Sequence, residues 1–359
     1  DPLRPEVKNA VEKAAQAGIQ TVMITGDHKM IAASIGKELG IVKNDNEVMD
    51  GSELVDAKTT EIQKILNTVR VFSRVSPEQK LRIVQAAQAN GNVVAVTGDG
   101  VNDAPAIKTA DIGIAMGISG TDVTKEVADI VLRDDNYSTI VRAVHEGRII
   151  FGNFIKFLRY QISCNLSGVF IIFFPTLFGF ASPLLPIHIL LLNLVSETGP
   201  SIALGLENGE KDVMQKPPRK KDDRLLTSKR WQEIIGEAVL LTIAGLGAFV
   251  VALRWAPEAL ATITLTTAFF SRLWHAFNSR SETHSVFSRA VYRNKSLELI
   301  VASTFVLFFL TVYTPLGNNY LSTVPLSVPI FVACLALSFI PVIGVEIYKL
   351  IKTRGLTIK

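Results

Sequence analysis

The stretch NVVAVTGDGVNDAPA, residues 92–106, joins an apolar run to a turn that is rich in glycine and carboxylates. Asn92–Thr97 predicts a buried strand, and the glycines that follow end it. Asp99, Asn102 and Asp103 supply three carboxylate or amide groups within five residues, a set that suits a hard cation such as Mg²⁺. An Asx-rich turn alone does not explain two carboxylates at one strand end, because without a cation their repulsion costs energy.

A second, shorter copy of the pattern lies upstream. Gln20–Thr25 predicts a short strand, after which the Thr25 hydroxyl, the Gly26 backbone N–H and the Asp27 carboxylate converge and can hold a phosphate. A turn followed by a helix N-cap explains the same three residues. Lys80, near a helix start in RVSPEQK, is either a solvated surface cation or a point charge for a phosphoryl oxygen.

Strands and helices alternate along the first half of the chain. The other strands expected there are Asp111–Met116 and Ala128–Leu132, and the helices are Pro5–Ala17, His28–Leu39 and Pro77–Ala89. This alternation predicts a doubly wound α/β domain with a parallel sheet. In that architecture the ligand crevice lies at the carboxyl ends of the strands, where both Thr-Gly-Asp tripeptides occur.

Charge separates the two halves of the 359-residue chain. Residues 1–150 carry 17 Lys and Arg against 21 Asp and Glu, a net charge of −4, whereas residues 151–359 carry 20 against 12, a net charge of +8. This division excludes a uniform soluble globule, a disordered tail protein and a coiled coil. The two cysteines, Cys164 and Cys334, lie in apolar runs and cannot form a disulfide framework, so the soluble part is expected in a reducing compartment.

The second half contains six apolar stretches of about 20 residues, each long enough to cross a bilayer. They are residues 157–179, 185–206, 232–253, 258–277, 297–315 and 326–348. Lys and Arg gather in the loops 207–230 and 278–295 and in the C-terminal tail, while the alternate loops carry only Arg254. Because positive loops stay in the cytosol, we expect a multi-pass membrane protein with the α/β domain and the C-terminus cytosolic. Residues 133–156 are expected to continue as a helix into the first span, as a stiff link or a simple tether.

Ionisable groups inside predicted spans mark a candidate membrane site. Asn193, Ser196 and Glu197 recur at helical spacing, and Gly199-Pro200 can unwind the helix and free carbonyls as cation ligands. A polar helix–helix contact explains Asn193 and Ser196 but not a buried Glu197. Interfacial placement suffices for Glu233, Glu237 and Glu346. The loop KPPRKKDDR, residues 216–224, can bind anionic lipid, contact the α/β domain, or serve only as a topology signal.

These motifs resemble those of the P-type ATPases, cation pumps with a haloacid-dehalogenase-like phosphorylation domain. The resemblance rests on TGDGVNDAPA, MITGD, FSRVSPEQK and GRIIFGNFIKFLRYQISCN, and NLVSETGP is similar to the calcium-pump branch. It implies that Asp99 is the Mg²⁺ ligand with Asp103 nearby, and that Lys80, Thr25 and Gly26 hold the phosphoryl group. It also implies that Asn102 and Asp103 complete the site, that Asp27 lies at the hinge, and that ATP is the substrate.

For the membrane site the resemblance implies that Asn165, Asn193, Ser196 and Glu197 hold the transported cation, most simply Ca²⁺. Gly168 and Arg272 stand where calcium pumps carry two acids of one calcium site. We therefore expect a single-ion pump with Arg272 as an internal counter-charge; snorkelling of Arg272 to the interface is the alternative. Other cations that fit the same mechanism are Mn²⁺, Na⁺/K⁺ and H⁺.

The family's nucleophilic DKTGT, its nucleotide-binding domain, its TGES loop and its PEGL helix do not occur in this sequence, and the chain begins at Asp1-Pro2. We therefore expect the C-terminal part of a pump, inactive alone. It comprises residues 1–146 of an incomplete haloacid-dehalogenase-like domain and residues 147–359 as an all-α six-helix transmembrane bundle. The expected partners are the bilayer and the missing N-terminal part, with no nucleic acid and a monomeric state. A membrane-anchored sensor module without hydrolysis is the alternative from another class, and a membrane-tethered phosphatase is disfavoured because it lacks its own nucleophile.

Overall fold

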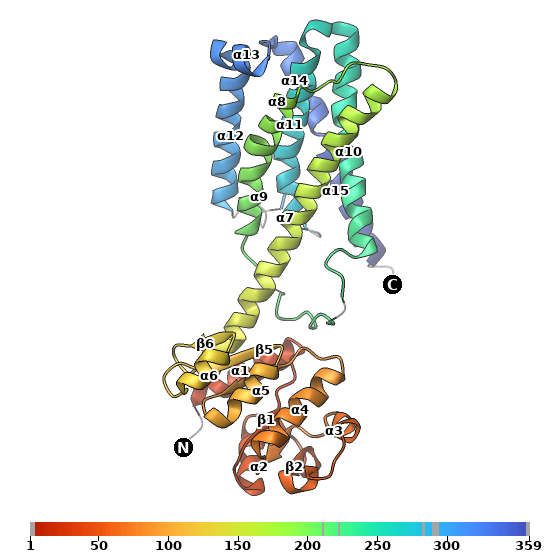
Figure 1. Ribbon diagram of the computed structural model, residues 1–359. Helices are drawn as coiled ribbons and strands as arrows, with labels where there is room; N and C mark the ends of the chain where they lie inside the picture. Colours follow the sequence, from red (N-terminus) through yellow and green to blue (C-terminus); the bar gives the residue numbers. More distant parts are fainter. Residues whose placement is uncertain (1–3, 210–211, 222, 282–283, 289–293, 357–359) are drawn as a thin grey trace. The chain divides into compact units, whose positions relative to one another are not determined.

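The computed structural model describes residues 4–209, 212–221, 223–281, 284–288 and 294–356 (Figure 1). Asp1-Pro2 and parts of the 278–295 loop and of the C-terminal tail therefore lie outside the described residues. The chain divides into two compact units. The first comprises Asp1–Arg148 with Glu210–Asp223, and the second comprises Ile149–Gly209 with Arg224–Lys359.

The first unit has six short strands in two parallel three-stranded sheets. The strands are β1 (Met23–Ile24), β2 (Val48–Asp50), β3 (Val71–Ser73), β4 (Ala95–Gly98), β5 (Ile112–Met116) and β6 (Ile130–Leu132). The order is β1-β3-β2 in one sheet and β4-β5-β6 in the other. The predicted parallel α/β class is confirmed, but β2 and β3 were not predicted, and the strands form two sheets rather than one. Strands of two or three residues carry too little periodicity to be found by pattern alone.

Helices surround these strands. The α-helices of the first unit are α1 (Pro5–Gln16), α2 (Lys29–Glu38), α3 (Thr59–Ile65), α4 (Pro77–Ala89), α5 (Ala104–Thr109) and α6 (Asp122–Val127), with 3₁₀ turns η1 (Asp45–Glu47), η2 (Gly51–Leu54) and η3 (Val101–Asp103). Local chemistry fixes the start of α4. The Gln79 backbone N–H donates to Ser76 Oγ at 3.2 Å, and the Ser76 N–H donates back to Gln79 Oε1 at 2.9 Å. This capping box, with Pro77 in the first turn, fixes where α4 begins and therefore where the Lys80 side chain lies on it.

Residues 212–221, from the basic loop, pack on the first unit. Arg148 donates to the backbone carbonyls of Val213 at 3.0 Å and Lys216 at 2.7 Å. Lys221 Nζ lies 2.8 Å from Asp111 Oδ1, and this hydrogen bond lowers the pKa of the Asp111 carboxyl below its usual range. Contact with the α/β domain, one of the three roles open to the KPPRKKDDR loop, is therefore present in the structure.

Asp135 closes another turn of the first unit. The backbone N–H groups of Ile118, Ser119 and Gly117 donate to its carboxylate at 3.0, 2.7 and 2.6 Å. Because these donors favour the charged form, they hold the pKa of Asp135 at about 2.

The second unit is helical. After α7 (Tyr137–Leu177), which runs on from the first unit, it contains α8 (Pro186–Leu191), η4 (Leu192–Glu197), α9 (Thr198–Gly205), α10 (Ser228–Trp255), η5 (Pro257–Ala259), α11 (Leu260–Ser279), α12 (Lys295–Tyr313), α13 (Pro315–Leu321), α14 (Val328–Ser338) and α15 (Ile340–Leu356). Among the described residues five helical segments are long and apolar enough to cross a membrane: Tyr137–Leu177, Pro186–Gly205, Ser228–Trp255, Lys295–Tyr313 and Val328–Lys352.

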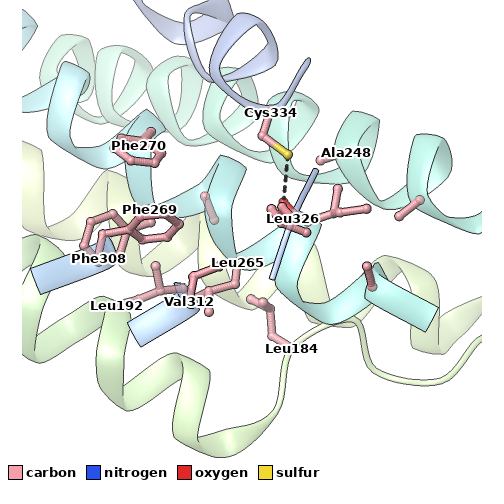
Figure 2. Packing of buried hydrophobic residues seen from close by; sticks show 14 of the residues in the cluster. Leu184, Leu192, Ala248, Leu265, Phe269, Phe270, Phe308, Val312, Leu326 and Cys334 are labelled. Atoms are coloured by element: carbon pink, nitrogen blue, oxygen red, sulfur yellow. Dashed lines mark hydrogen bonds between the residues drawn. The ribbon is translucent and has the colours of Figure 1, made fainter. Parts of the chain in front are cut away.

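The sixth predicted span, residues 258–277, corresponds to α11 and does not meet the same measure of apolarity. α11 packs against α10, α14, α15 and η4, and most of its residues are buried. A helix enclosed by other helices does not face lipid, so its surface does not need to be apolar. Its Phe269 and Phe270 pack on Phe308 of α12 in the main core of the bundle (Figure 2).

Candidate functional site

Lys80 and Asp103 form the centre of the phosphoryl-site candidates. Lys80 Nζ lies 2.8 Å from Asp103 Oδ1 and 3.4 Å from the Thr97 carbonyl oxygen. The other oxygen, Asp103 Oδ2, accepts from the backbone N–H groups of Asp99 at 3.3 Å and Gly100 at 3.4 Å. Lys80 is thus held at the carboxyl end of β4 by a carboxylate that the turn itself positions.

Gly98 permits this arrangement. A Cβ atom at residue 98 would lie 2.5 Å from both Cβ and Oδ2 of Asp103, closer than real Cβ contacts come. The glycine is therefore required for the turn to fold back against Asp103.

Asp99 is placed differently from Asp103. Its side chain is exposed, and in the described part of the chain its carboxylate has no hydrogen-bond or ion-pair partner. Asn102 is exposed on η3 beside it. Within the same described residues no three His, Cys, Asp or Glu side chains form a preformed metal cluster. A free carboxylate with an amide nearby fits Mg²⁺, which keeps several water ligands and takes one or two carboxylates from the protein.

Thr25, Gly26 and Asp27 follow β1. The Thr25 hydroxyl donates to Asp27 Oδ2 at 2.8 Å and accepts from the Asp27 backbone N–H at 3.1 Å. A Cβ added at Gly26 would have no atom within 4 Å, so this backbone is open to a ligand. No hydrogen bond or ion pair between described residues joins these three to Lys80, Asp99 or Asp103. The two tripeptides belong to separate sheets: residues 25–27 follow the edge strand β1, and residues 97–99 lie at the end of the edge strand β4.

The membrane-site candidates meet around Glu197, which is completely buried at the end of η4. Glu197 Oε1 lies 3.1 Å from Arg272 Nε of α11, and Glu197 Oε2 accepts from Gln161 Nε2 of α7 at 3.0 Å. Gln161 Oε1 in turn accepts from Ser201 Oγ of α9 at 2.8 Å. Two helices, α7 and α11, therefore supply the direct contacts of one buried carboxylate, and α9 contacts Gln161 in turn.

Arg272 is 2% exposed, and its Nη2 donates to the Cys164 carbonyl oxygen at 3.2 Å. Its charge lies inside the bundle, so the snorkelling alternative does not describe this structure. A Cβ added at Gly168 would lie 3.0 Å from Arg272 Nη2. The absence of a side chain at Gly168 thus leaves the space that the guanidinium uses.

The backbone at this site departs from the prediction. Unwinding was expected at Gly199-Pro200, but the irregular segment is the π-helical stretch η4, which precedes them, and α9 contains both residues. A π turn makes i→i+5 contacts and alters which residues share a face. Ser196 Oγ donates to the Leu192 carbonyl at 2.7 Å within this segment.

The remaining candidates are less enclosed than Glu197. Asn193 is half-buried, and its carbonyl oxygen accepts from Thr198 Oγ1 at 2.9 Å. Asn165 is exposed and donates to the Gln161 carbonyl at 2.9 Å.

A second buried charge cluster was missed by sequence reasoning. Interfacial placement was expected for Glu233 and Glu237. Both side chains are buried against other helices, and Arg159 of α7 binds Glu237 through two guanidinium nitrogens. Lys352 Nζ lies 3.0 Å from Glu233 Oε1. Glu346 was also expected at the interface, and its Oε1 lies 3.3 Å from Lys349 Nζ. The available signal was that each of these carboxylates lies near a predicted span end together with a basic residue, on another helix for Glu233 and Glu237 and on the same helix for Glu346.

Comparisons with known proteins agree with this geometry. Residues 181–351 match the family described as "Cation transporting ATPase, C-terminus", and residues 1–111 and 80–144 match haloacid dehalogenase-like hydrolase families. The chain is 42% identical over 95% of its length to a calcium-transporting ATPase of Bacillus subtilis, covering 38% of that protein. It is 40% identical over 98% of its length to calcium-transporting ATPase 1 of Bacillus cereus, covering 42% of it. It is 37% identical over 97% of its length to calcium-transporting ATPase type 2C member 1 of Bos taurus, covering 37% of it.

The chain thus spans about two fifths of the length of these relatives. The family matches cover both the unit that carries Lys80 and Asp103 and the helices that carry Glu197 and Arg272. The haloacid-dehalogenase-like fold and the cation-ATPase membrane region occur in the predicted order along one chain. The chain belongs to the P-type cation-transporting ATPases.

Proposed function

We propose that this chain is the C-terminal part of an ATP-driven pump that exports Ca²⁺ from the cytosol and carries one ion per cycle. The calcium assignment is supported by the names of the relatives. The single-ion assignment rests on one observation, the buried Arg272–Glu197 pair beside Gly168. A fixed guanidinium among the candidate oxygen ligands repels a second divalent cation by direct Coulomb interaction.

In the phosphorylation unit, Lys80 neutralises charge on the transferred phosphoryl group. Asp103 keeps its ammonium at the strand end. Thr25 offers a hydroxyl and Gly26 an open backbone to the phosphoryl oxygens. Asp27 orients the Thr25 hydroxyl and lies at the hinge of the phosphorylation unit. Asn102 completes the phosphoryl site. The free Asp99 carboxylate is the residue suited to hold Mg²⁺, which supplies charge neutralisation on the phosphate when bound.

The nucleophilic aspartate comes from the missing N-terminal part. β1 and β4 are each at the edge of their sheet, and an edge strand leaves a row of unpaired backbone N–H and C=O groups. We propose that a strand bearing the nucleophile pairs with both edges, joining the two sheets and bringing Thr25 toward Lys80. Amides of β1 and β4 should then exchange hydrogen faster in the 359-residue chain than in the complete pump.

In the membrane, Glu197, Asn193, Ser196 and Asn165 are proposed to provide oxygen ligands for the transported ion, together with the missing part. Arg272 remains as an internal counter-charge after ion release, which limits the cost of an empty, buried carboxylate. With six spans, including α11, the phosphorylation unit and the C-terminus are proposed to lie in the cytosol, and the positive charge of the alternate loops supports this orientation. A monomeric pump is proposed.

The test uses the complete pump. Phosphoenzyme formed from ATP should depend on Ca²⁺ and not on Mn²⁺, Na⁺, K⁺ or H⁺, and Asp99→Asn should abolish it while leaving the protein folded. Wild-type protein should bind one Ca²⁺ per phosphoenzyme, and Arg272→Glu should change this ratio. Lys229→Glu, on the exposed start of α10, is the matched charge control. A wild-type ratio of two overturns the single-ion assignment. Phosphoenzyme formation that depends on Mn²⁺, Na⁺, K⁺ or H⁺ instead of Ca²⁺ overturns the assignment of calcium as the transported ion. Unchanged activity of Asp99→Asn favours the sensor alternative.

A further inference from the structure

An apolar cavity of about 220 Å³ lies between α10, α11 and α14. Its lining includes Val251 and Trp255 of α10, Ile263 of α11, and Ile330, Ala333 and Leu337 of α14. The floor is buried, since Ile263 is 2% exposed, whereas the rim is open, since Trp255 is 74% exposed. The cavity is therefore a groove on the outer surface of the bundle.

Among the described residues that line the groove, the side chains are apolar apart from one thiol, so they offer little to hold a water molecule. Cys334 also lines it, and its thiol already donates to the Ile263 carbonyl oxygen, the contact drawn as a dashed line in Figure 2. Empty apolar cavities of this size stay dry and accept apolar ligands. For a groove on membrane helices, the hydrocarbon chain of a lipid has the matching chemistry.

Two donors for an anion lie on Trp255, which lines the groove, and on the residue before it. Arg254 precedes Trp255 at the C-terminal end of α10, is exposed, and in the described part of the chain makes no hydrogen bond or ion pair. The Trp255 indole N–H is likewise without a partner among those residues. Glu258 lies nearby on η5 and is exposed, but it forms no ion pair with Arg254. An indole N–H on the lining of a dry apolar groove and a guanidinium on the preceding residue complement a phosphate that is linked to an acyl chain.

Arg254 is also unusual for its place along the chain. The predicted topology puts this end of α10 on the extracytoplasmic side, where Lys and Arg are otherwise absent from the connecting loops. A cation here runs against the charge bias that orients the helices, so insertion does not account for it. Binding of an anionic headgroup does account for it.

We propose that α10, α11 and α14 form a binding site for one anionic phospholipid, with the phosphate on Arg254 and Trp255 and an acyl chain in the groove. The site lies apart from the residues proposed for ion transport and phosphoryl transfer. It depends only on insertion of these helices in a membrane.

The test is native mass spectrometry of the detergent-purified 359-residue chain with phosphatidylglycerol or phosphatidylcholine of identical acyl chains. Wild type should retain one phosphatidylglycerol in preference to phosphatidylcholine. Arg254→Gln should lower the affinity for phosphatidylglycerol by about fivefold, because one basic residue near the membrane surface contributes about 1 kcal/mol. Lys229→Gln, at the other end of α10, is the matched control and should change nothing.

The groove is tested separately by filling it. Ala333→Phe should reduce binding of both lipids, while Val250→Phe, on an exposed position of α10 outside the groove, should not. Equal retention of the two lipids by wild type, or an unchanged affinity in Arg254→Gln, overturns the headgroup assignment. Full lipid binding by Ala333→Phe overturns the groove assignment. A dimer that Ala333→Phe dissociates would assign the groove to a second copy of the chain and overturn the proposal. Because Arg254 is on the surface, its variant remains informative if Ala333→Phe does not fold.

Discussion

Arg272→Leu removes the guanidinium whose Nε lies 3.1 Å from Glu197 Oε1. The two side chains are only 3% and 0% exposed, so water does not replace the lost partner. At an effective dielectric constant of about 20, two unit charges at this separation attract by about 5 kcal/mol. Removing one partner of a buried pair costs about 3–5 kcal/mol, and we expect a loss of this size in the free energy of unfolding of the second unit.

The assay is equilibrium unfolding of the 359-residue chain in mixed micelles of mild detergent and dodecyl sulfate. Glu197→Leu should cost a similar amount, because it leaves the guanidinium buried with the Cys164 carbonyl. The double variant should be more stable than the two single losses imply, with a coupling free energy of about 2–3 kcal/mol. Lys229→Leu, which removes an exposed cation from α10, is the control for a change in charge alone. Additive losses, within about 0.5 kcal/mol, would refute the assignment of a direct pair.

Three further changes follow from contacts in the structure. Gly168→Ala should change the free energy of unfolding little in wild type, because crowding of Arg272 opposes the gain in helix propensity. In the Arg272→Leu background the same substitution should stabilise the protein by about 1 kcal/mol in the same unfolding assay. Equal effects in both backgrounds would contradict the contact between residue 168 and Arg272. Asp135→Asn should destabilise the first unit at pH 7 but not near pH 2. A carboxylate whose pKa is lowered by folding contributes stability above its unfolded pKa of about 4, and this stability is lost as the pH falls to the folded pKa. Chemical unfolding of wild type and variant at several pH values measures this, and a pH-independent difference would contradict it. Lys221→Ala should raise the pKa of Asp111. It should also speed proteolysis within residues 212–221 by up to about fivefold, the size expected for loss of an exposed ion pair. An unchanged rate would show that this ion pair does not hold the segment.

Local patterns predicted the elements that carry the candidate phosphoryl-site residues, because each element depends on a few neighbours. The strand that contains Thr97 and the capping box at Ser76 are each encoded within six residues, and they bring Lys80 and Asp103 together at the end of β4. The split into two sheets was not predictable in the same way. Whether a strand finds a partner on a given edge depends on segments far along the chain.

The same difference between local patterns and long-range packing holds for the membrane region. Apolar runs predicted all six helical segments, although α11 does not meet the measure of apolarity that the other five meet, and its polar residues face other helices rather than lipid. Spacing placed Asn193, Ser196 and Glu197 on one regular helix, but the π-helical backbone of η4 changed their arrangement.

By itself, the sequence determined the parallel α/β unit, the apolar helices after it, and the residue types that carry charge in each. Only the tertiary structure decided that Arg272 meets Glu197, that Gly168 leaves space for it, and that Arg159 is buried against Glu237. The reason is physical. Strand, turn and helix preferences arise from backbone and side-chain interactions over a few residues, whereas a buried ion pair exists only when packing brings separate helices within about 4 Å of each other and excludes water.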